Sequence, residues 1–351
     1  MSSGQLLLLD YVTASESRAE DWDGVLGAAA FAASTCNGDR ALRAGGDLPL
    51  AHVCTPVLND GSAVLEVWRT GGRTESGSHG QVRYGRAGDL LFGSVAIEEA
   101  DLAGAGGSDP RTPLEIATDS AYRQMYATLA AAGTPHLVRV WNYLPEINID
   151  THGLERYRQF NNARHEASLA CGRAIAGGVP AASALGAASG SPLTIYFLAS
   201  RRAPAFIENP RQVSAYRYPA QYGPRSPAFS RATVLGAGSA AVLFISGTAS
   251  IVGHQTLHAG DPAAQTRETL VNIEALLAQA ARGCDMETLA LETLQYKVYV
   301  RDPRELPVIR AELESALGPR AALLYLKADI CRRDLSVEIE AVGGGSSRPA
   351  A

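Results

Sequence analysis

One carboxyl group and one thiol near the end of the chain are spaced so that they could do acid–base chemistry together. The stretch Tyr325–Val342, YLKADICRRDLSVEIEAV, predicts an antiparallel hairpin with its turn centred between Asp334 and Leu335. That turn sets Cys331 opposite Glu338. Opposed residues in an antiparallel pair share one face of the sheet, with Cβ atoms about 5 Å apart. A carboxyl group beside a thiol on a half-covered sheet face could serve as a proton donor.

The same hairpin has a plainer interpretation. Period-two alternation puts Glu338 and Glu340 on one face of the last strand. Val337 and Ile339 then lie on the other face. An edge strand with solvated glutamates, beside a buried Cys331 that acts as a small hydrophobe, would show the same pattern. The hairpin alone favours this second interpretation, so a catalytic role needs support from the rest of the chain.

Length and composition narrow the class of protein. The chain has 351 residues, which favours two domains. With 46% hydrophobic and 19% charged residues it can bury a sizeable core. A net charge of -5 and a pI near 5.8 give no electrostatic reason to expect nucleic acid as a partner. Basic charge is almost all arginine, since Lys297 and Lys327 are the only lysines. Arginine forks bind carboxylates in bidentate fashion.

Cysteine usage and the N-terminus bear on where the protein works. The five cysteines are odd in number and form no CxxC pair, which predicts reduced thiols in a cytoplasmic protein. The N-terminal MSSGQLLLLDYV lacks the basic region of a signal peptide. No apolar run approaches the ~20 residues that span a bilayer, so we expect no membrane association.

His254 and His258 in HQTLH lack the glutamate of a zinc motif, so we expect no metal there.

Two stretches of the chain repeat the same order of predicted elements. Four pairs of segments carry the correspondence: 90–97 with 242–251, 138–144 with 296–302, 155–167 with 304–316, and 193–200 with 322–329. A repeat of this length predicts a duplicated domain. We place the first domain at 1–225, with extra N-terminal strands, the second at 226–343, and a disordered tail at 344–351. The segment 177–191, rich in Gly, Ala and Ser, is expected to be a loop or a loose helix.

The second repeat resembles the RidA/YjgF family. The resemblance rests on SGTASIVG (Ser246–Gly253), the segment Gly260–Ala280 and VEIEAVG (Val337–Gly343). It implies an α+β fold of two tandem RidA/YjgF-like (chorismate mutase-like) domains, each a mixed β-sheet backed by two helices. Proteins of that family are usually trimers with sites at subunit interfaces. Leu323 stands where the family's imine deaminases carry an arginine that anchors a carboxylate, which counts against that activity.

The full length resembles a narrower group, the chorismatase family, whose members cleave chorismate in secondary metabolism. Five segments carry this resemblance: VWNYLPEIN (Val140–Asn148), RYRQFNNAR (Arg156–Arg164), the Tyr- and Arg-rich Glu208–Ala232, SGTASIVGH (Ser246–His254) and CRRDLSVEIE (Cys331–Glu340). They span both halves of the chain. The resemblance implies removal of pyruvate from chorismate at a site between the domains, with no metal or organic cofactor.

Chorismate is a dianion with an acid-labile enolpyruvyl ether, so its cleavage needs a proton donor. Protonation of the enol methylene carbon gives an oxocarbenium ion, and the donor must remain protonated near neutral pH. A glutamic acid in a poorly solvated cleft meets this need, because desolvation raises its pKa. Glu338 occupies the position that looks like the family's catalytic glutamate, so we expect it to be the general acid.

The two carboxylates of chorismate need cationic partners. Arginines and tyrosines in the family-like segments form the expected binding set: Arg164, Arg217, Arg231, Tyr216 and Tyr222. Tyr143, which ends a predicted strand together with Asn142, is a further candidate, although core packing explains it equally well. Gly247 lies within a predicted strand, where glycine marks a bulge or a close approach, and we expect a ligand contact there.

Two products are open to the protonated intermediate. Attack by water would leave trans-3,4-dihydroxycyclohexa-1,5-diene carboxylate. Displacement by the substrate's own C4 hydroxyl would lead through an epoxide to 3-hydroxybenzoate. The resemblance implies two subgroups, and Cys331 with Gly247 is the pairing of the aromatic product, with Cys331 acting on the same intermediate as Glu338.

Rival interpretations remain open at this point. The chain could be a RidA-like enamine or imine hydrolase, or a RidA-like ligand-binding protein without catalytic activity. The oligomeric state is open between a homotrimer and a monomer whose duplicated halves replace subunit contacts.

Overall fold

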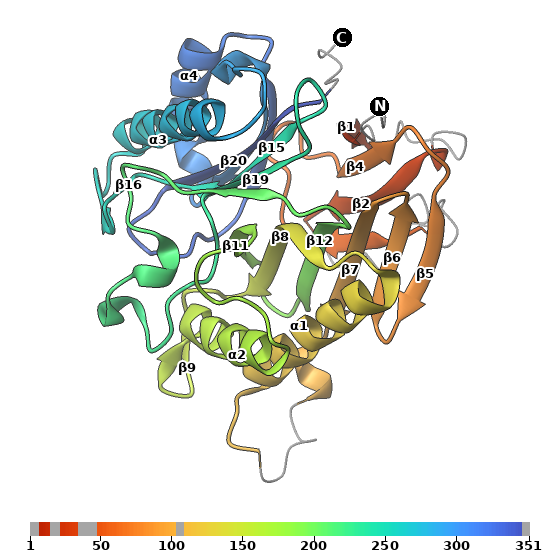
Figure 1. The fold of residues 1–351 in the computed structure, drawn as a ribbon. Coiled ribbons are helices and arrows are strands. Elements are labelled where there is room, and N and C mark those ends of the chain that lie inside the picture. Colours follow the sequence, from red (N-terminus) through yellow and green to blue (C-terminus); the bar gives the residue numbers. More distant parts are fainter. Residues whose placement is uncertain (1–6, 15–21, 34–47, 103–108, 346–351) are drawn as a thin grey trace.

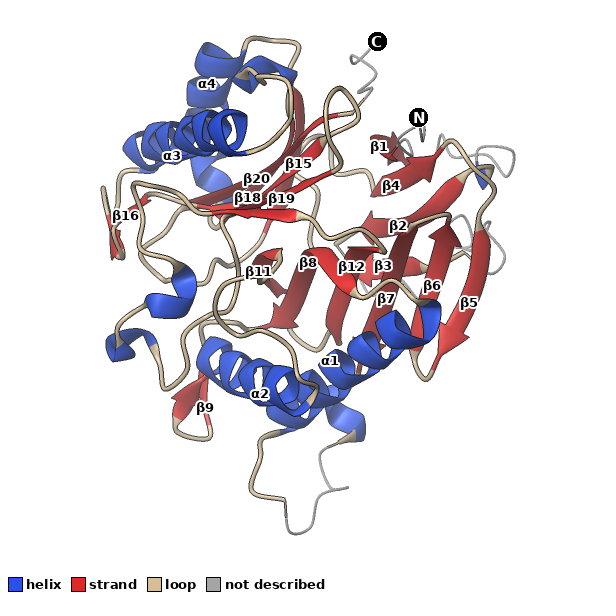
Figure 2. Cartoon of the chain, in the orientation of Figure 1, coloured by secondary structure: helices blue, strands red, loops and turns tan. Residues whose placement is uncertain are grey.

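Two large mixed sheets and a smaller N-terminal sheet build the protein, which we describe from a computed structural model (Figure 1, Figure 2). The structure describes residues 7–14, 22–33, 48–102 and 109–345. The first large sheet contains, in spatial order, β5 (Glu75–His79), β6 (Val82–Ala87), β7 (Leu90–Ile97), β12 (Leu193–Ser200), β8 (His136–Pro145) and β11 (Ala181–Ala187). The second contains β13 (Ala205–Ile207), β14 (Ala232–Leu235), β15 (Val242–Thr248), β20 (Val337–Gly344), β18 (Gln295–Val300) and β19 (Ala322–Lys327).

Helices and small ribbons complete the architecture. The helices are α1 (Pro113–Ala132), α2 (Arg156–Ala170), α3 (Pro262–Gly283) and α4 (Leu306–Leu317). The N-terminal sheet has the order β1 (Leu7–Thr13), β4 (Val64–Thr70), β2 (Val25–Phe31) and β3 (Leu50–Val53). Two-residue strands form the small ribbons β9 (Asp150–Thr151) with β10 (Leu154–Glu155), and β16 (Ile251–Val252) with β17 (Gln255–Thr256). Within the described ranges, no helix is long and apolar enough to cross a bilayer.

The two large sheets are built in the same way. Each half runs strand, strand, strand, helix, strand, helix, strand, strand, and the spatial order of the corresponding strands is identical. Parallel pairing occurs at the same place in both halves, between β8 and β11 and between β18 and β19. The predicted fold class is confirmed: the chain is α+β, with two tandem halves that each back a mixed sheet with two helices.

One of the four predicted correspondences is wrong. β12 (193–200) occupies the place of β20, and the counterpart of β19 is β11. β11 lies in the segment that we expected to be a loop or a loose helix. Its sequence, AASALGA, lacks an alternating pattern because both of its faces are packed, with Ala182 toward the helices and Leu185 toward the central core. The second half covers its outer edge. There the Ala182 N–H donates to Ser246 Oγ at 3.0 Å, and the Gly186 N–H donates to Asp329 O at 2.7 Å.

The chain passes from the first sheet to the second between β12 and β13. β13 is hydrogen-bonded to β14, so the second sheet begins at Ala205, ahead of the boundary that the sequence placed at 225/226. The long connection from β13 to β14 holds two short 3-10 turns, Ala215–Arg217 and Ala220–Tyr222. Of the predicted tail, Gly344 ends β20, and residues 346–351 lie outside the described residues.

The predicted terminal hairpin is wrong, although the strand of glutamates is real. β18 lies between β19 and β20, parallel to the first and antiparallel to the second, so the last two strands do not pair. β20 is therefore an inner strand, and its glutamates do not lie on an exposed edge. The polar residues before it form a connection across the end of β18 rather than a tight turn. The alternation itself holds, because Val337 and Ile339 pack on the helix side and Glu338 and Glu340 face the other way.

Local sequence explains where the long helices begin. Thr112 Oγ accepts from the Glu115 N–H at 3.2 Å, and the Glu115 carboxylate accepts from the Thr112 N–H at 2.9 Å, which is a capping box at the start of α1. Asp261 caps α3 by accepting from the Ala264 N–H at 2.9 Å. Both helices have proline at their first position, where no N–H is needed.

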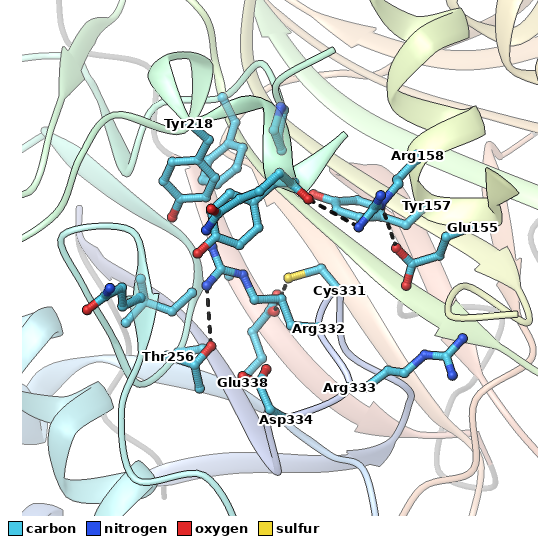
Figure 3. A pocket seen from close by; sticks show the side chains of 18 of the residues that line it. Glu155, Tyr157, Arg158, Tyr218, Thr256, Cys331, Arg332, Arg333, Asp334 and Glu338 are labelled. Atoms are coloured by element: carbon cyan, nitrogen blue, oxygen red, sulfur yellow. Dashed lines mark hydrogen bonds and ion pairs between the residues drawn. The ribbon is translucent and has the colours of Figure 1, made fainter. Parts of the chain in front are cut away.

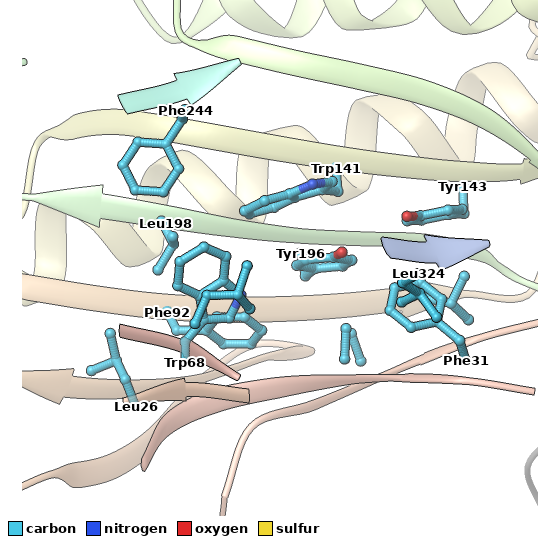
Figure 4. Packing of buried hydrophobic residues seen from close by; sticks show 14 of the residues in the cluster. Leu26, Phe31, Trp68, Phe92, Trp141, Tyr143, Tyr196, Leu198, Phe244 and Leu324 are labelled. Atoms are coloured by element: carbon cyan, nitrogen blue, oxygen red, sulfur yellow. The ribbon is translucent and has the colours of Figure 1, made fainter. Parts of the chain in front are cut away.

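All three sheets turn one face toward a shared core (Figure 4). Trp68 of the N-terminal sheet lies between Trp141 of the first large sheet and Phe244 of the second, with ring centroids 5.7 and 5.8 Å away. Tyr196 stacks on Trp141 at 4.6 Å. The helices cover the opposite faces, α1 and α2 on the first large sheet and α3 and α4 on the second (Figure 1). Packing against this core sets how the two halves meet.

A buried ionic network crosses the same core. Lys297 Nζ on β18 lies 2.5 Å from Glu66 Oε2 on β4 and 2.6 Å from Glu340 Oε1 on β20. Arg139 Nη2 on β8 lies 2.6 Å from Glu340 Oε2. The two cations balance the two carboxylates, and none of the four side chains is more than 5% exposed. Charges at this depth are tolerated only when they are paired, so the three sheets must dock with these strands aligned.

We expect Lys297→Met to lower the free energy of unfolding by about 3–5 kcal/mol, because it leaves Glu66 buried without its cation and takes one cation from Glu340. The matched control is Lys327→Met, which removes the chain's other lysine from a half-buried position at the end of β19. We expect that change to stay within about 0.5 kcal/mol. Chemical denaturation followed by tryptophan fluorescence measures both, and equal effects would show that the network does not hold the sheets together.

Candidate active site

A cavity of about 860 Å³ lies between the two halves (Figure 3). The first half contributes Tyr157 and Arg158 from the start of α2. The second half contributes β15, the connection between β13 and β14, and the residues from Cys331 to Glu338. Sites for small molecules measure about 300–1,000 Å³. The cavity therefore has the size of a small-molecule site, and neither half forms it alone.

Glu338 brings a buried carboxyl group to this cavity, with 4% of the residue exposed. Cys331 Sγ lies 4.0 Å from Glu338 Oε2, although the two residues are not paired across a hairpin. Gly247 on β15 lies against the other oxygen. A Cβ atom at this glycine would lie 1.9 Å from Glu338 Oε1, so glycine is needed for the carboxyl group to occupy its place.

The surroundings of Glu338 keep its carboxyl group neutral. Burial raises the pKa of Glu338 to about 8, and the negative charge of Glu340 acts in the same direction. Arg139, Arg231 and Arg301 oppose this rise in pKa without cancelling it. Glu338 therefore holds its proton at neutral pH, which is the state that a general acid requires.

Glu340, two residues further along β20, is in the opposite protonation state. Although burial favours its neutral form, Lys297 and Arg139 lower the pKa of Glu340 below the ordinary value. Trp141 and Ser183 also donate to its carboxylate, both at 2.7 Å. One strand thus carries a neutral acid at the cavity and a fixed negative charge behind it. Carboxyl groups whose pKa values are driven apart in this way are typical of acid–base sites.

The thiol of Cys331 is a neutral neighbour of this acid. Burial raises the pKa of Cys331 to about 12, and the negative charge that Glu338 carries once it has ionised acts in the same direction. A thiol with so high a pKa is not a nucleophile at neutral pH, because the thiolate is the reactive form. What Cys331 supplies is its volume and a weak S–H hydrogen bond.

Two arginines that line the cavity have buried N–H groups. Arg231 Nη2 donates to Val213 O at 2.9 Å and to Tyr218 OH at 2.8 Å, and its buried Nε has no hydrogen-bond partner among the described residues. Arg332 Nη1 donates to His254 O at 2.9 Å, and its buried Nη2 likewise has no partner in the described part of the chain. A buried donor without a partner costs about 1–3 kcal/mol. Both groups are therefore suited to an anionic ligand.

Five of the residues expected in the site line the cavity: Tyr222, Arg231, Gly247, Cys331 and Glu338. Tyr143 is not among them, because it belongs to the central core, where its OH lies 2.6 Å from Tyr299 OH. Asn142 accepts from Tyr122 OH at 2.8 Å and is buried as well. Arg164 is buried on α2, where it donates to Asn161 Oδ1 at 2.7 Å.

Tyr216 and Arg217 also lie outside the cavity lining. They belong to the first 3-10 turn of the connection between β13 and β14, and Arg217 is exposed. The segment is irregular, so its sequence has no period that shows which side chains turn inward. Tyr218 and Tyr222, further along the same connection, are the tyrosines that reach the cavity.

Several residues that the sequence analysis did not select also line the cavity, among them Tyr157, Arg158, Tyr218 and Arg332. Each of these four lies inside a segment that carried the family resemblance. Arg332 directly follows Cys331, and its guanidinium lies 4.1 Å from the centre of the Tyr222 ring. Adjacency to Cys331 was the signal that would have found it.

The described ranges contain no group of three or more His, Cys, Asp or Glu side chains arranged to hold a metal ion. His254 of the HQTLH motif instead lies beside Tyr222, whose OH donates to the His254 carbonyl oxygen at 2.6 Å.

Comparison with known proteins shows which family this chain belongs to. A family model described as Chorismatase FkbO/Hyg5-like, N-terminal, matches residues 66–199. The chain is 38% identical over 286 residues to a 3-hydroxybenzoate synthase of Streptomyces hygroscopicus, covering 79% of this chain and 80% of that protein. This chain belongs to the chorismatase family. A chorismatase of Streptomyces rapamycinicus is 39% identical over 301 residues, covering 84% of this chain and 86% of that one.

The family likeness extends to the whole fold. A crystal structure of a chorismatase superposes with a TM-score of 0.86 at 32% sequence identity, covering 98% of this chain and 100% of that chain. The duplicated halves, with the cavity between them, thus belong to the architecture that this chain shares with a chorismatase.

The raised pKa of Glu338 predicts how stability depends on pH. In the folded protein Glu338 keeps its proton up to about pH 8, whereas the ordinary pKa is 4.5. Its contribution to stability is fully present below pH 4.5 and is lost as pH rises through about 8. The glutamine in Glu338→Gln cannot ionise, so this variant does not share the loss of stability that wild type undergoes between pH 5 and pH 9. We therefore expect the free energy of unfolding of the variant, relative to wild type, to increase over this range by on the order of a few kcal/mol.

Denaturant titrations at a series of pH values measure this difference. Glu75→Gln is the control, because Glu75 lies exposed on β5 beside Arg86 and its pKa is lowered, so its difference from wild type should stay flat across this range. A flat difference for Glu338→Gln as well would show that Glu338 is ionised in the folded protein at neutral pH.

Proposed function

We propose that this chain cleaves chorismate to pyruvate and 3-hydroxybenzoate, with Glu338 as the general acid. The observation that carries the proposal is a carboxyl group that stays neutral at physiological pH, inside a cavity supplied with buried arginine donors. The names of two relatives support the same chemistry, since one is called a 3-hydroxybenzoate synthase and the other a chorismatase.

The arginines supply recognition of the substrate's two carboxylates. Arg231 Nε and Arg332 Nη2 each offer a buried donor that a carboxylate oxygen would satisfy. Charge-assisted bonds of this kind are roughly twice as strong as neutral ones. Tyr218 holds both groups in place, because its OH accepts from Arg231 and its ring lies 5.2 Å from the Arg332 guanidinium. Recognition of a dianion therefore falls to Arg231 and Arg332 rather than to Arg164 and Arg217.

Glu338 supplies the proton that starts the reaction. Its transfer to the methylene carbon of the enolpyruvyl group makes an oxocarbenium ion and leaves a carboxylate on Glu338. The C4 hydroxyl oxygen then attacks C3, the C3–O bond breaks and releases pyruvate, and the hydroxyl proton returns to the Glu338 carboxylate. The resulting epoxide opens and loses its ring proton to give 3-hydroxybenzoate. The atoms of chorismate are divided between the two products, and no water is consumed.

Cys331 favours the aromatic product because of where its sulfur lies. It contacts the Glu338 carboxyl group at 4.0 Å and fills space that a water molecule would otherwise share with the acid. As a neutral thiol it can also assist proton movement during epoxide opening without adding a charge. Gly247 contributes by leaving room for the carboxyl group itself.

We expect Glu338→Gln to lower pyruvate release from chorismate by about 10²–10⁴-fold, because the amide keeps the shape of the acid but has no acidic proton to donate. Calorimetric titration with chorismate should still show binding, since the arginines are untouched. Glu75→Gln, an exposed change of the same kind, should behave as wild type.

The same assay separates the rival functions. A wild-type protein that binds chorismate without releasing pyruvate would be a ligand-binding protein. One that hydrolyses imines but leaves chorismate intact would be a hydrolase of the RidA type. A Glu338→Gln protein that still releases pyruvate at nearly the wild-type rate would remove Glu338 from the mechanism.

Cys331→Ala tests the product. We expect wild type to form 3-hydroxybenzoate and Cys331→Ala to shift the products toward the trans-dihydroxy diene acid, because the smaller side chain admits water beside Glu338. Chromatography of the products measures the ratio. Cys284→Ala is the control, since Cys284 packs near the end of α3, outside the cavity lining. A wild type that yields mainly the diene acid would contradict the product assignment while leaving chorismate cleavage in place.

A further inference from the structure

Two buried carboxyl groups follow one another on the same face of β20. Glu338 and Glu340 are 4% and 3% exposed, and residues i and i+2 of a strand lie about 7 Å apart. We propose that Glu340 is a positioning residue whose fixed negative charge holds Glu338 in its protonated form, and that Lys297 and Arg139 serve catalysis by keeping Glu340 ionised. This inference rests on the function proposed above, in which Glu338 is the acid.

The hydrogen bonds of Glu340 show that its charge is built into the fold. Oε1 accepts from Lys297 Nζ at 2.6 Å and from the Trp141 indole N–H at 2.7 Å. Oε2 accepts from Arg139 Nη2 at 2.6 Å and from Ser183 Oγ at 2.7 Å. Donors therefore occupy both oxygens, and a proton on either one would displace a charged partner.

Glu338 lacks such donors. Within the described residues, the Glu338 carboxyl group accepts one weak hydrogen bond, from Cys331 Sγ at 4.0 Å. The Gly247 backbone lies against Glu338 Oε1, but its N–H donates to Ser183 Oγ at 3.0 Å instead. Ser183 thus bonds to Glu340 and also accepts from the N–H of the glycine that lies beside Glu338.

Other charged and titratable groups surround both carboxyl groups. Those that face Glu338 are Arg139 on β8, Tyr157 on α2, Arg231 before β14, Tyr299 on β18, Arg301 after β18, and Cys331, Arg332 and Asp334 before β20. Those that face Glu340 are Lys297, Arg139, Glu66 and the phenols of Tyr11, Tyr143, Tyr196 and Tyr299. Arg231 and Arg301 oppose Glu340 in its effect on Glu338, yet burial and the charge of Glu340 together prevail, with the pKa of Glu338 raised to about 8.

Matched double variants separate the charge of Glu340 from the stability of the network. Arg139→Gln with Glu340→Gln removes one ion pair and keeps the pair between Lys297 and Glu66. Glu66→Gln with Lys297→Met removes the other pair and keeps Arg139 with Glu340. Each double variant removes one cation and one carboxylate, so the buried charge stays balanced. Only the first removes the negative charge beside Glu338.

The readout is the pH at which Glu338 loses its proton, measured on the full chain without substrate. Infrared spectroscopy follows the carbonyl band of a protonated carboxylic acid, and the same background carrying Glu338→Gln supplies the baseline. We expect Glu340→Gln to lower this midpoint by about one to two pH units, the effect of one charge about 7 Å away at an effective dielectric constant of about 20. The Arg139/Glu340 double variant should lower it by less, because Arg139 also leaves, and the Glu66/Lys297 double variant should leave it unchanged.

The pH above which kcat/KM for pyruvate release falls should shift together with the infrared midpoint in each variant. A merely structural role for Glu340 would not cause this shared shift. A folded Glu340→Gln variant with the wild-type midpoint overturns the proposal. An equal shift in the Glu66/Lys297 variant overturns it too, because it would trace the effect to loosened packing.

Ser183→Ala removes only a hydroxyl and tests the part that Ser183 plays beside the charge of Glu340. We expect a lower midpoint, because the Gly247 N–H loses its partner next to Glu338. An unchanged midpoint would exclude Ser183 from the proposal and leave the charge variants to decide it. The infrared titration needs no turnover, so a protein that released no pyruvate would overturn the proposed function while this result still stood.

Discussion

The buried carboxylate of Glu340 joins the packing of three sheets to the surroundings of Glu338, the proposed acid. The two large sheets each supply one cation from strands in corresponding places, Arg139 from β8 and Lys297 from β18. The N-terminal sheet supplies Glu66, which balances Lys297. Because charges at this depth need their partners, the sheets have few ways to dock. The docking that satisfies them also sets the Gly247 N–H on Ser183 Oγ, at the edge of the cavity.

The two walls of the cavity come from halves with the same strand order and different side chains. β12, in the place that β20 holds in the second half, reads LTIYFLAS and carries no carboxyl group. Its Tyr196 lies in the central core and accepts from Lys297 Nζ at 2.8 Å. The first half meets the cavity instead through the start of α2, with Tyr157 and Arg158. One half therefore holds the acid, and the other covers it and excludes solvent.

The features that suit this site to chemistry lower the stability of the fold. Because burial holds the Glu338 carboxyl group neutral, the free energy of unfolding falls as pH rises. The buried donors of Arg231 and Arg332 lack partners among the described residues, which also costs stability. These costs are offset elsewhere, in the aromatic packing of Trp68, Trp141 and Phe244 and in the paired charges beside them. Destabilising groups of this kind concentrate at functional sites, because a ligand can supply the partner that the protein does not.

The sequence by itself determined most of the elements, though not β11, and it pointed to Glu338 as the proposed acid, whereas only the tertiary structure decided what surrounds Glu338. Capping residues and period-two alternation are local, so the helices and the shared face of Glu338 and Glu340 could be predicted from neighbouring residues. Strand order is not local: β18 comes between β19 and β20, and the contact of Cys331 with Glu338 arises from a connection rather than a hairpin. Glu340 meets Arg139 across 201 positions of the chain. A pKa follows from burial and from neighbouring charges, which exist only once the sheets have docked, and this is why the pKa of Glu338 is raised while that of Glu340 is lowered.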